Sequence, residues 1–479
     1  MTRATRQPEA ARGRPAGRCA PGTVLIVTLG ILIVLTGLVL ALAHSMRIEG
    51  LCSANRVSSQ QAAAIEQGAI QYVVAAVDGL DGQVTGEADL FCDGVQVGDG
   101  AFWLLRPDRD DDQVYAFGLA DEAGKINLNS ATEEMLAKLP DMTVDVPAAI
   151  IDWRDADSDL TEGGAESEYY LLLSDPYDCK NGPVETVEEL LLVRLVSADL
   201  LFGEDANRNG VLDENENDAD TSDPPDNRDG HLDRGIADVV TVYSHEPDTR
   251  GEEDEEDKPV NVNKARTRDL AEVLVDAVSK ERLPEILLRA GQGKPFQNLL
   301  DFYLRTGLKS EEFNAIADRI TTQDGKPPAG LLNVNTASRD ALLCLPELDE
   351  ADVSALVAAR PSAEGDEGDE GEQTEDETAG AGAIAWVADA LPAEKAVAIG
   401  SCITTRSYQF SADIVSISGD GRAFRRCRIV VDAANSPPRV LYRKDLTHLG
   451  WPLSPDIVSL LRSGAAVQEV LETTYQEVQ

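Results

Sequence analysis

The stretch GTVLIVTLGILIVLTGLVLALA, residues 22–43, determines how the rest of this chain can fold. From Thr23 to Ala43 it has 21 consecutive uncharged, mostly apolar residues, enough to cross a bilayer as one helix. Before the run, a single acid, Glu9, stands against five arginines: Arg3, Arg6, Arg12, Arg14 and Arg18. The positive-inside rule therefore predicts a cytoplasmic N-terminus and export of the bulk of the chain. A cleaved signal peptide fits less well, because the run is long and no A-x-A-like site follows it.

The helical pattern continues beyond the apolar run. No proline occurs between Met46 and Val77. Apolar residues recur there at helical spacing: Ile48, Leu51, Ala54, Ile65, Ala69, Val73 and Val77. One helix over residues 23–77 would be about 80 Å long at 1.5 Å per residue. Half of it lies beyond the bilayer and needs a domain to pack on, which is the layout of type IV pilin-like proteins.

The junction Gly22-Thr23 resembles a prepilin peptidase cleavage site, because a basic leader is followed by glycine and then by an apolar helix. In most of that superfamily the fifth residue after the cut is glutamate, whereas here it is Val27. The K-type minor pseudopilins of type II secretion systems characteristically lack this glutamate, so the N-terminus resembles theirs. An ordinary membrane anchor with a chance Gly-Thr pair is the alternative.

Strand signals lie at the two ends of the remaining chain. Residues 101–105 and 113–119 read as two short strands around a polar turn, and 408–418 with 423–431 read as a hairpin, with 439–443 as a further strand. The region between them is mostly helical. We therefore predict an α+β fold in which the long N-terminal helix packs on a small antiparallel sheet that is split by a large α-helical insertion.

Three segments share the pattern N-[LV]-N-x-A, at residues 127–131, 261–265 and 333–337. The first and the third precede helices that end in Leu-Pro, and we expect Asn129, Ser130, Asn335 or Thr336 to cap these helices. Such units resemble helix-hairpin-helix or SAM-like modules, which often bind DNA. The hairpins at 140–143 and 346–349 carry acids and no glycine, so the phosphate-binding backbone is missing. We expect scaffold helices and no nucleic-acid partner, since the net charge is also −44.

The strongest family likeness lies between the first two of these segments. Residues 148–157, 168–170, 180–183 and 187–194 match the K-type minor pseudopilins in order and spacing. Asp152, Asp155 and Asp157 could suggest acid–base catalysis, but no nucleophile motif or glycine loop accompanies them. We expect a structural helix with an acidic end and no enzymatic activity.

Residues 205–216, DANRNGVLDENE, satisfy the calcium-loop pattern D-x-[DN]-x-[DN]-G-x5-E. Calcium takes six to eight hard oxygen ligands, which this spacing supplies around a glycine bend. The expected ligands are Asp205, Asn207, Asn209, the Val211 carbonyl, Asp213 and Glu216, with Leu212 packed inward. A weaker second loop contains Asn227, Asp229, Gly230, Leu232 and Asp233, but it has Pro225 and Ile236 at its end positions. We expect bound Ca²⁺ to have a structural role.

Seven cysteines occur, six of them after Gly22, and none forms a C-x-x-C pair. Cys402 with Cys427 is the first choice for a disulfide, and free buried thiols are the alternative. Two acidic linkers are expected at 251–258 and 361–382, and the second interrupts a helical unit that 384–399 should complete.

The predicted organisation is a leader (1–22), the long helix (23–77), the first part of a pilin-like β domain (78–120), the α-helical insertion (121–400), C-terminal strands (401–445) and a tail (446–479). The resemblance implies a non-enzymatic minor pseudopilin at the tip of the pseudopilus, in the bacterial inner membrane with its bulk periplasmic. The implied partners are I- and J-type minor pseudopilins, the major pseudopilin and, for processing, the prepilin peptidase. Alternatives are a DNA-binding competence protein, a type IV minor pilin and a calcium-stabilised adhesin.

Overall fold

The structure is a computed structural model, and it describes residues 21–80, 82–83, 90, 92–108, 112–219, 221, 224–247, 259–323, 329–361 and 384–471, without the side chains of 21–23. The basic leader up to residue 20, the acidic linker 251–258 and nearly all of the linker 361–382 lie outside the described residues. The chain forms two units, residues 1–58 and residues 59–479.

Helix α1 (Pro21–Val77) is continuous and ends at the residue where the helical pattern was predicted to end. Among the described residues it is the one helix that is long and apolar enough to cross a membrane. The side chains of Val24 to Leu42 that were predicted to face lipid are exposed in the first unit. In the second unit α1 presents a buried stripe made of Ala62, Ile65, Ala69, Ile70, Val73 and Val77. Their spacing of three and four residues places them on one helix face.

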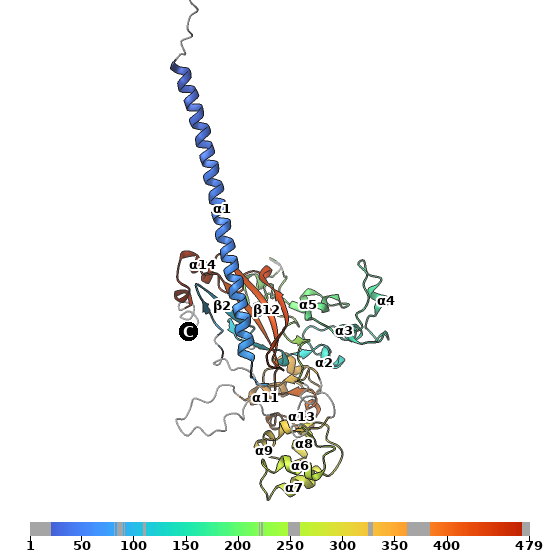
Figure 1. Cartoon of the computed structure of the whole chain (residues 1–479). Helices are drawn as coiled ribbons and strands as arrows, with labels where there is room; N and C mark the ends of the chain where they lie inside the picture. The colour runs from blue at the N-terminus through green and yellow to red at the C-terminus, as the bar shows by residue number, and fades with distance from the viewer. Residues whose placement is uncertain are drawn as a thin grey trace, which may run out of the picture. The chain divides into compact units, whose positions relative to one another are not determined.

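One antiparallel sheet forms from strands at both ends of the chain, as predicted (Figure 1). Its strands are β1 (Val95–Val97), β2 (Gly100–Arg106), β3 (Ala116–Phe117), β4 (Ala120–Asp121), β11 (Gln409–Ile417), β12 (Phe424–Asp432) and β13 (Arg439–Asp445). The order is β1-β2-β11-β12-β13, with β3 added to β2 and β4 added to β11. Because β2 and β4 pair with β11, the sheet forms only when chain segments on either side of the insertion come together.

The sheet has two apolar faces, because successive side chains of a strand point to opposite sides. Phe102 and Leu104 of β2 face the buried stripe of α1. Trp103 of β2 lies in a separate cluster with Ile457 and Leu461 of α14 (Pro455–Ser463). The C-terminal tail, for which the sequence predicted no role, therefore covers the face of the sheet opposite α1.

The described residues of the insertion form three parallel two-stranded pairs, and each begins at one of the N-[LV]-N-x-A segments. The pairs are β5 (Ile126–Asn127) with β6 (Val240–Thr241), β7 (Val260–Asn261) with β8 (Ile320–Thr321), and β9 (Leu332–Asn333) with β10 (Ile403–Thr404). The third pair is closed by β10, which follows the acidic linker. Val387, Ala396 and Ile399 pack in one core with Leu342, so residues 384–399 complete this module, as the sequence predicted. The repeated sequence thus marks a repeated structural module.

Short helices fill each module, and those of the second module, α6–α9, gather together in Figure 1. The first module holds α2 (Glu133–Ala137), α3 (Val146–Arg154), α4 (Ser167–Tyr170) and α5 (Ala198–Phe202). The second holds α6 (Thr267–Leu274), α7 (Leu283–Ala290), α8 (Leu299–Thr306) and α9 (Ser310–Asn314). The third holds α10 (Arg339–Leu343), α11 (Glu350–Ala359), α12 (Trp386–Ala390) and α13 (Ala393–Ile399). The first and third modules share one apolar core, and the second has its own.

The predicted helix caps were wrong. Thr132 caps α2 and Ser338 caps α10, each accepting a hydrogen bond from the backbone amide three residues on. The repeated segment itself forms a turn, in which the side chain of its first asparagine accepts from the amide of the second. The helices therefore begin later than the predicted caps Asn129, Ser130, Asn335 and Thr336.

The cysteines in the described part of the chain are all free, so the expected Cys402–Cys427 disulfide is not formed. Cys427 lies on β12 in the core against α1, whereas Cys402 packs against the core of the insertion. The two residues belong to different cores, which explains why they do not pair.

Candidate functional site

The loop at residues 205–216 has the bend that its sequence predicted. Gly210 adopts φ +76°, a backbone conformation that residues with a Cβ rarely adopt. A Cβ at this position would lie 3.0 Å from Cα of Pro107. The Asp205 carboxylate stabilises the bend, because it accepts hydrogen bonds from the amides of Asn209 at 3.1 Å and Gly210 at 2.9 Å. The glycine and the first acid of the pattern therefore form one turn.

Two asparagines continue the turn and connect it to Asp213. The Asn207 side-chain oxygen accepts from the Asn209 amide at 2.9 Å, and the Asn209 side-chain oxygen accepts from the Val211 amide at 2.8 Å. Both side-chain amides donate to Oδ2 of Asp213, at 2.6 Å from Asn207 and 3.1 Å from Asn209. The predicted ligands Asn207, Asn209 and Asp213 thus lie around one bend, and their side-chain oxygens accept hydrogen bonds within the loop.

Glu216 closes the loop. It lies in the 3₁₀-helix η3 (Glu214–Glu216), and one oxygen accepts from the Ala206 amide at 2.9 Å while the other accepts from the Asp213 amide at 3.0 Å. Only 1% of Glu216 is exposed. The last acid of the pattern therefore connects the start of the loop to its end. Leu212 is only partly buried, whereas Val211 is buried, so the inward residue differs from the predicted one.

The loop carries buried negative charge. Burial, together with the nearby Asp238 carboxylate, raises the pKa of Asp205 to about 6. Burial, together with Asp205 and Asp213, raises the pKa of Glu216 to about 7. Raised carboxyl pKa values mean that the surroundings do not fully compensate the ionised forms. A cation at this loop would supply that compensation.

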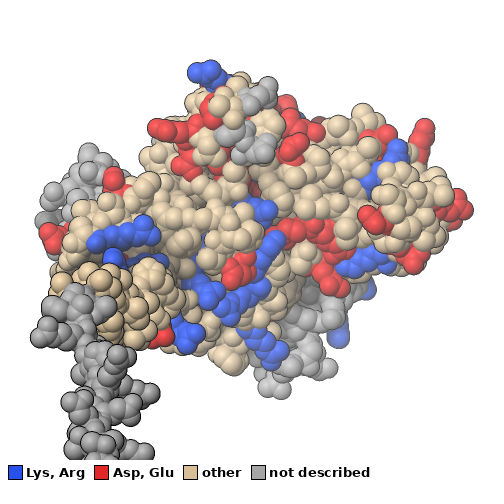
Figure 2. All heavy atoms as spheres, turned by 90° about the horizontal axis from the view of Figure 1, so that it is seen from above, with Lys and Arg blue, Asp and Glu red and all other residues tan. Residues whose placement is uncertain are grey.

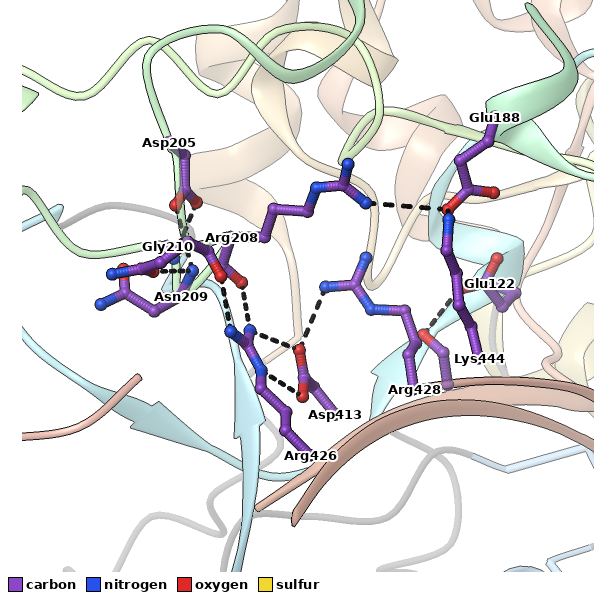
Figure 3. Close-up of polar contacts among 12 residues, drawn as sticks. Glu122, Glu188, Asp205, Arg208, Asn209, Gly210, Asp413, Arg426, Arg428 and Lys444 are labelled. Carbon is purple, nitrogen blue, oxygen red and sulfur yellow. Dashed lines mark hydrogen bonds and ion pairs between the residues drawn. The ribbon is translucent and has the colours of Figure 1, made fainter. Parts of the chain in front are cut away.

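Arg426 of β12 connects the loop to the sheet (Figure 3). Its side chain is 0% exposed and donates to both carboxylate oxygens of Asp413 on β11, at 3.0 and 2.7 Å. The same guanidinium donates to the carbonyls of Asn207 and Arg208, the latter at 2.7 Å. The loop backbone is therefore fixed to the centre of the sheet by an arginine that is more than 200 residues away in sequence.

A second group of ion pairs lies beside Arg426. Arg428 donates to Asp413 at 3.3 Å, and Glu188 pairs with Lys444 of β13 at 2.6 Å and with Arg208 at 3.8 Å (Figure 3). The Glu188–Lys444 pair joins the first module of the insertion to β13, whereas the Arg428–Asp413 pair lies within the sheet. On the face seen in Figure 2, Lys and Arg gather in a run across the surface, so the negative net charge is not spread evenly.

The loop offers the donor types that calcium prefers, namely carboxylates, side-chain amides and one backbone carbonyl. Among the described residues, no three His, Cys, Asp or Glu side chains come together as a cluster that could hold a metal by themselves. A metal at this loop would therefore need its asparagines and the Val211 carbonyl as well as its acids. The donor set fits calcium and does not fit zinc, which binds cysteine and histidine.

The second candidate loop is also a formed turn. Asn227 donates from its side chain to Asp233 at 3.0 Å, and Asp229 accepts from the His231 amide at 2.8 Å. Its end position is held by Ile236, which is fully buried, so the loop has no carboxylate of its own there.

The hairpins that resemble DNA-binding units present acids. Asp141 and Glu347 adopt positive φ values, 53° and 60°, at positions where a phosphate-binding hairpin would have glycine. Their carboxylates would repel a phosphate.

The segment with the strongest family likeness forms a packed structural group. Asp152 is fully buried, and both its carboxylate oxygens accept from the Thr161 amide at 3.3 Å. The Trp153 indole donates to Glu189 at 2.8 Å, and Glu189 also pairs with Lys180 at 2.8 Å. These contacts hold α3 in place, as expected for a structural helix.

The predicted cleavage junction lies at the start of α1. Gly22 and Thr23 are helical in backbone, and the arginine-rich leader lies outside the described residues. Val27, the residue in place of the usual glutamate, is 60% exposed. Processing at this junction remains a prediction.

Comparison with known proteins identifies one segment. A family model described as type II secretion system (T2SS), protein K, matches residues 124–202. A solved chain in the GspK–GspI–GspJ complex of the enterotoxigenic Escherichia coli type 2 secretion system matches over 84% of this chain and 98% of that chain, at 11% identity and a TM-score of 0.38. No curated protein matches the chain. The family match confirms the predicted K-type resemblance over residues 124–202.

Proposed function

We propose, from the premise that residues 124–202 are a type II secretion system protein K segment, that the chain is a minor pseudopilin. The observation that carries the proposal is the position of that segment. It lies in an insertion between β4 and β11, which are paired strands of one sheet. Helix α1 packs on one face of this sheet, as in a pilin-like unit. The molecule acts through surface contacts and not through an active site.

The proposed location follows from the N-terminus. Helix α1 from Val24 has the length and the mean hydropathy of a membrane span, and five arginines precede it. These features support a single-pass protein of the bacterial inner membrane with a periplasmic body, cut by a prepilin peptidase between Gly22 and Thr23. Insertion of the processed helix among those of other pseudopilins would then place the subunit in the filament.

The proposed position is the tip of the pseudopilus, where the chain would help to start assembly. Residues 122–408 add three helical modules to a single small sheet, and a subunit of that width is difficult to stack within a filament shaft. The solved complex named above contains GspK with GspI and GspJ, and I- and J-type minor pseudopilins are the partners proposed here, with the major pseudopilin below them.

A secretion assay in the native host tests this function. Deletion of the gene should leave folded exoproteins in the periplasm, and the full chain supplied in trans should restore their release. A chain lacking residues 1–43 should be produced and should not restore release, because it has no anchor. Normal secretion in the deletion strain would contradict the proposal.

We also propose that residues 205–216 bind one Ca²⁺ in a structural role. The buried acids with raised pKa and the conformation of the loop support this assignment. Calorimetry on the metal-free full chain in detergent should give calcium binding that Glu216→Gln abolishes. Glu214→Gln is the matched control, because Glu214 is exposed in the same 3₁₀-helix and is not a predicted ligand. Equal calcium binding by both variants would contradict the assignment.

A further inference from the structure

An exposed apolar surface lies on the first module of the insertion. More than half of the exposed large apolar side chains among the described residues of the second unit fall within residues 144–195. They are Val144, Leu160, Tyr169, Leu171, Leu172, Leu191, Leu192 and Leu195. A single exposed apolar residue is ordinary, but a concentration of them in one short stretch indicates an interaction site.

Two segments form the centre of this surface, residues 169–172 of α4 and the turn after it, and residues 191–195. The Tyr177 hydroxyl, from the chain between them, donates to the carbonyl of Leu192 at 2.7 Å. The Tyr177 ring stacks on Tyr170, which is fully buried, with the ring centroids 5.3 Å apart. The exposed leucines therefore rest on a buried aromatic base that holds the two segments together.

Arg194 connects the parts of the surface. Its amide donates to the Tyr170 hydroxyl at 3.2 Å, and its guanidinium donates to the carbonyls of Gly163 at 3.1 Å and Gly164 at 2.8 Å. The guanidinium also lies 5.3 Å from the centroid of the exposed Tyr169 ring, which is within the range of a cation–π contact. Tyrosine and arginine are enriched among the residues that contribute most to protein binding.

The backbone of Leu195 is strained although its side chain is not buried. Leu195 has φ +68°, and among the described residues it is the one large apolar residue with positive φ. This conformation is unfavourable for a residue with a Cβ. The side chain is 54% exposed, so burial does not offset the strain. Strained residues of this kind gather at binding sites, where a partner makes the missing contacts.

The exposed charges around the surface are acidic. Between residues 157 and 199 the exposed charged residues are Asp157, Asp159, Glu162, Glu168, Asp175, Asp178, Glu185 and Asp199. The basic residues of the same stretch are Lys180 and Arg194, which are only partly exposed and are bonded within the module. A complementary partner therefore has an apolar centre with basic residues around it.

Charge also disfavours other occupants of this surface. A second copy would bring the same acidic rim against this one, and an anionic lipid surface would be repelled. The acidic linkers of the chain, 251–258 and 361–382, carry the same charge. They also contain no large apolar residue that could cover the leucines.

We propose that the eight exposed apolar residues of 144–195 form a docking surface for a protein partner whose face has an apolar centre and a basic rim. The surface lies on the insertion, and in Figure 1 helix α4 lies at the outer edge of the view, away from α1. The contact is therefore separate from the proposed packing of α1 among other pseudopilins, and it does not depend on that function.

Photo-crosslinking of the full chain in its native host tests the proposal. The photoreactive amino acid p-benzoylphenylalanine replaces Leu172, which is 87% exposed on this surface. In the control chain it replaces Leu288, which is 61% exposed on α7 of the second module. Crosslinked products are purified through the chain and identified by mass spectrometry. Position 172 should give a product with a second protein, and position 288 should not.

Two further changes in the position-172 chain test the chemistry of the contact. Leu192→Ser should lower the yield of the product about fivefold or more, because it removes an apolar contact from the centre. Glu168→Lys should also lower the yield, because a basic rim would then meet a like charge. Glu281→Lys, at an exposed acid of the second module, is the matched control and should leave the yield unchanged. Melting curves that match wild type would show that the variants are folded.

Several results would overturn the proposal. A product made of two copies of the chain, a phospholipid adduct alone, or no product above that of position 288 would each do so. A product whose yield is unchanged by Leu192→Ser or by Glu168→Lys would show that the contact lacks the proposed apolar centre or basic rim.

Discussion

Arg426 is a fully buried cation whose guanidinium bonds reach one carboxylate and two backbone carbonyls. Removal of one partner of a buried ion pair leaves the other charge uncompensated, which costs about 3–5 kcal/mol. Arg426→Met should therefore destabilise the protein by about that amount in urea unfolding. Arg425→Met is the matched control, since Arg425 lies next to it on β12 and its side chain is 38% exposed. Equal unfolding free energies for the two variants would show that the buried pair has no such role.

Glu216 should make the stability of the metal-free protein depend on pH. Its pKa near 7 in the folded protein exceeds the ordinary value of 4.5, so the folded metal-free chain holds this proton more tightly than the unfolded chain does. The metal-free protein therefore loses stability as pH rises from about 4.5 to about 7. Glutamine cannot ionise, so in EGTA Glu216→Gln should equal wild type near pH 5 and exceed it by about 1–3 kcal/mol near pH 8. With calcium present, the wild type should instead be more stable than Glu216→Gln. In EGTA, a stability difference between the two that does not change with pH would contradict this prediction.

The residues of the site differ in how far sequence could identify them. The six predicted ligands lie within twelve residues, so their spacing alone placed them on one turn. Arg426 lies 219 residues from Asn207, with no local pattern to mark it. Such partners are set by tertiary packing, which periodicity and motifs do not encode.

The second asparagine of the repeated segment makes the same hydrogen bonds in the first and second modules. In the second module, Asn263 bonds both backbone groups of Phe296, donating at 2.9 Å and accepting at 2.7 Å. Asn129 makes the same pair of bonds with Val184 in the first module. The second asparagine of the repeat thus joins the start of a module to a later segment, and it does not cap a helix as the sequence had suggested.

Asn263→Ala should destabilise the second module, because it leaves an amide and a carbonyl of Phe296 without partners. Each such group costs about 1–3 kcal/mol when buried. Hydrogen exchange should therefore speed up across α6–α9 and stay unchanged in the sheet. Arg268→Ala, at an exposed site on α6, should leave exchange close to that of wild type. Unchanged exchange in Asn263→Ala would contradict the role given to this residue.

The packing of helix α14 on the sheet can be tested with two neighbouring leucines. Leu461 is 2% exposed against the sheet and Leu460 is 36% exposed, although the two are neighbours. Leu461→Ala should cost about 2–5 kcal/mol of unfolding free energy, because it leaves a cavity in the apolar core. Leu460→Ala should cost much less. Similar losses for the two variants would show that the tail does not cover the sheet. The sequence separated residues 446–479 as a tail, but it did not indicate which face of the sheet the tail covers.

At the scale of the whole molecule, the sequence predicted the long helix, the split sheet and the helical insertion, because each leaves a strong periodic signal. It did not predict that β4 pairs with β11, nor that α14 shields the second face of the sheet. Those features depend on contacts between distant segments. They are also the features that join the segment matching the protein K family to the unit formed by α1 and the sheet.

We propose that this chain is a processed minor pseudopilin that assembles with others of its kind. The most direct measurement is affinity purification of the full chain from membranes of its native host, followed by mass spectrometry of the chain and its partners. We expect a chain that begins at Thr23, together with I- and J-type minor pseudopilins. A chain that keeps residues 1–22 and carries no pseudopilin with it would contradict the proposed function.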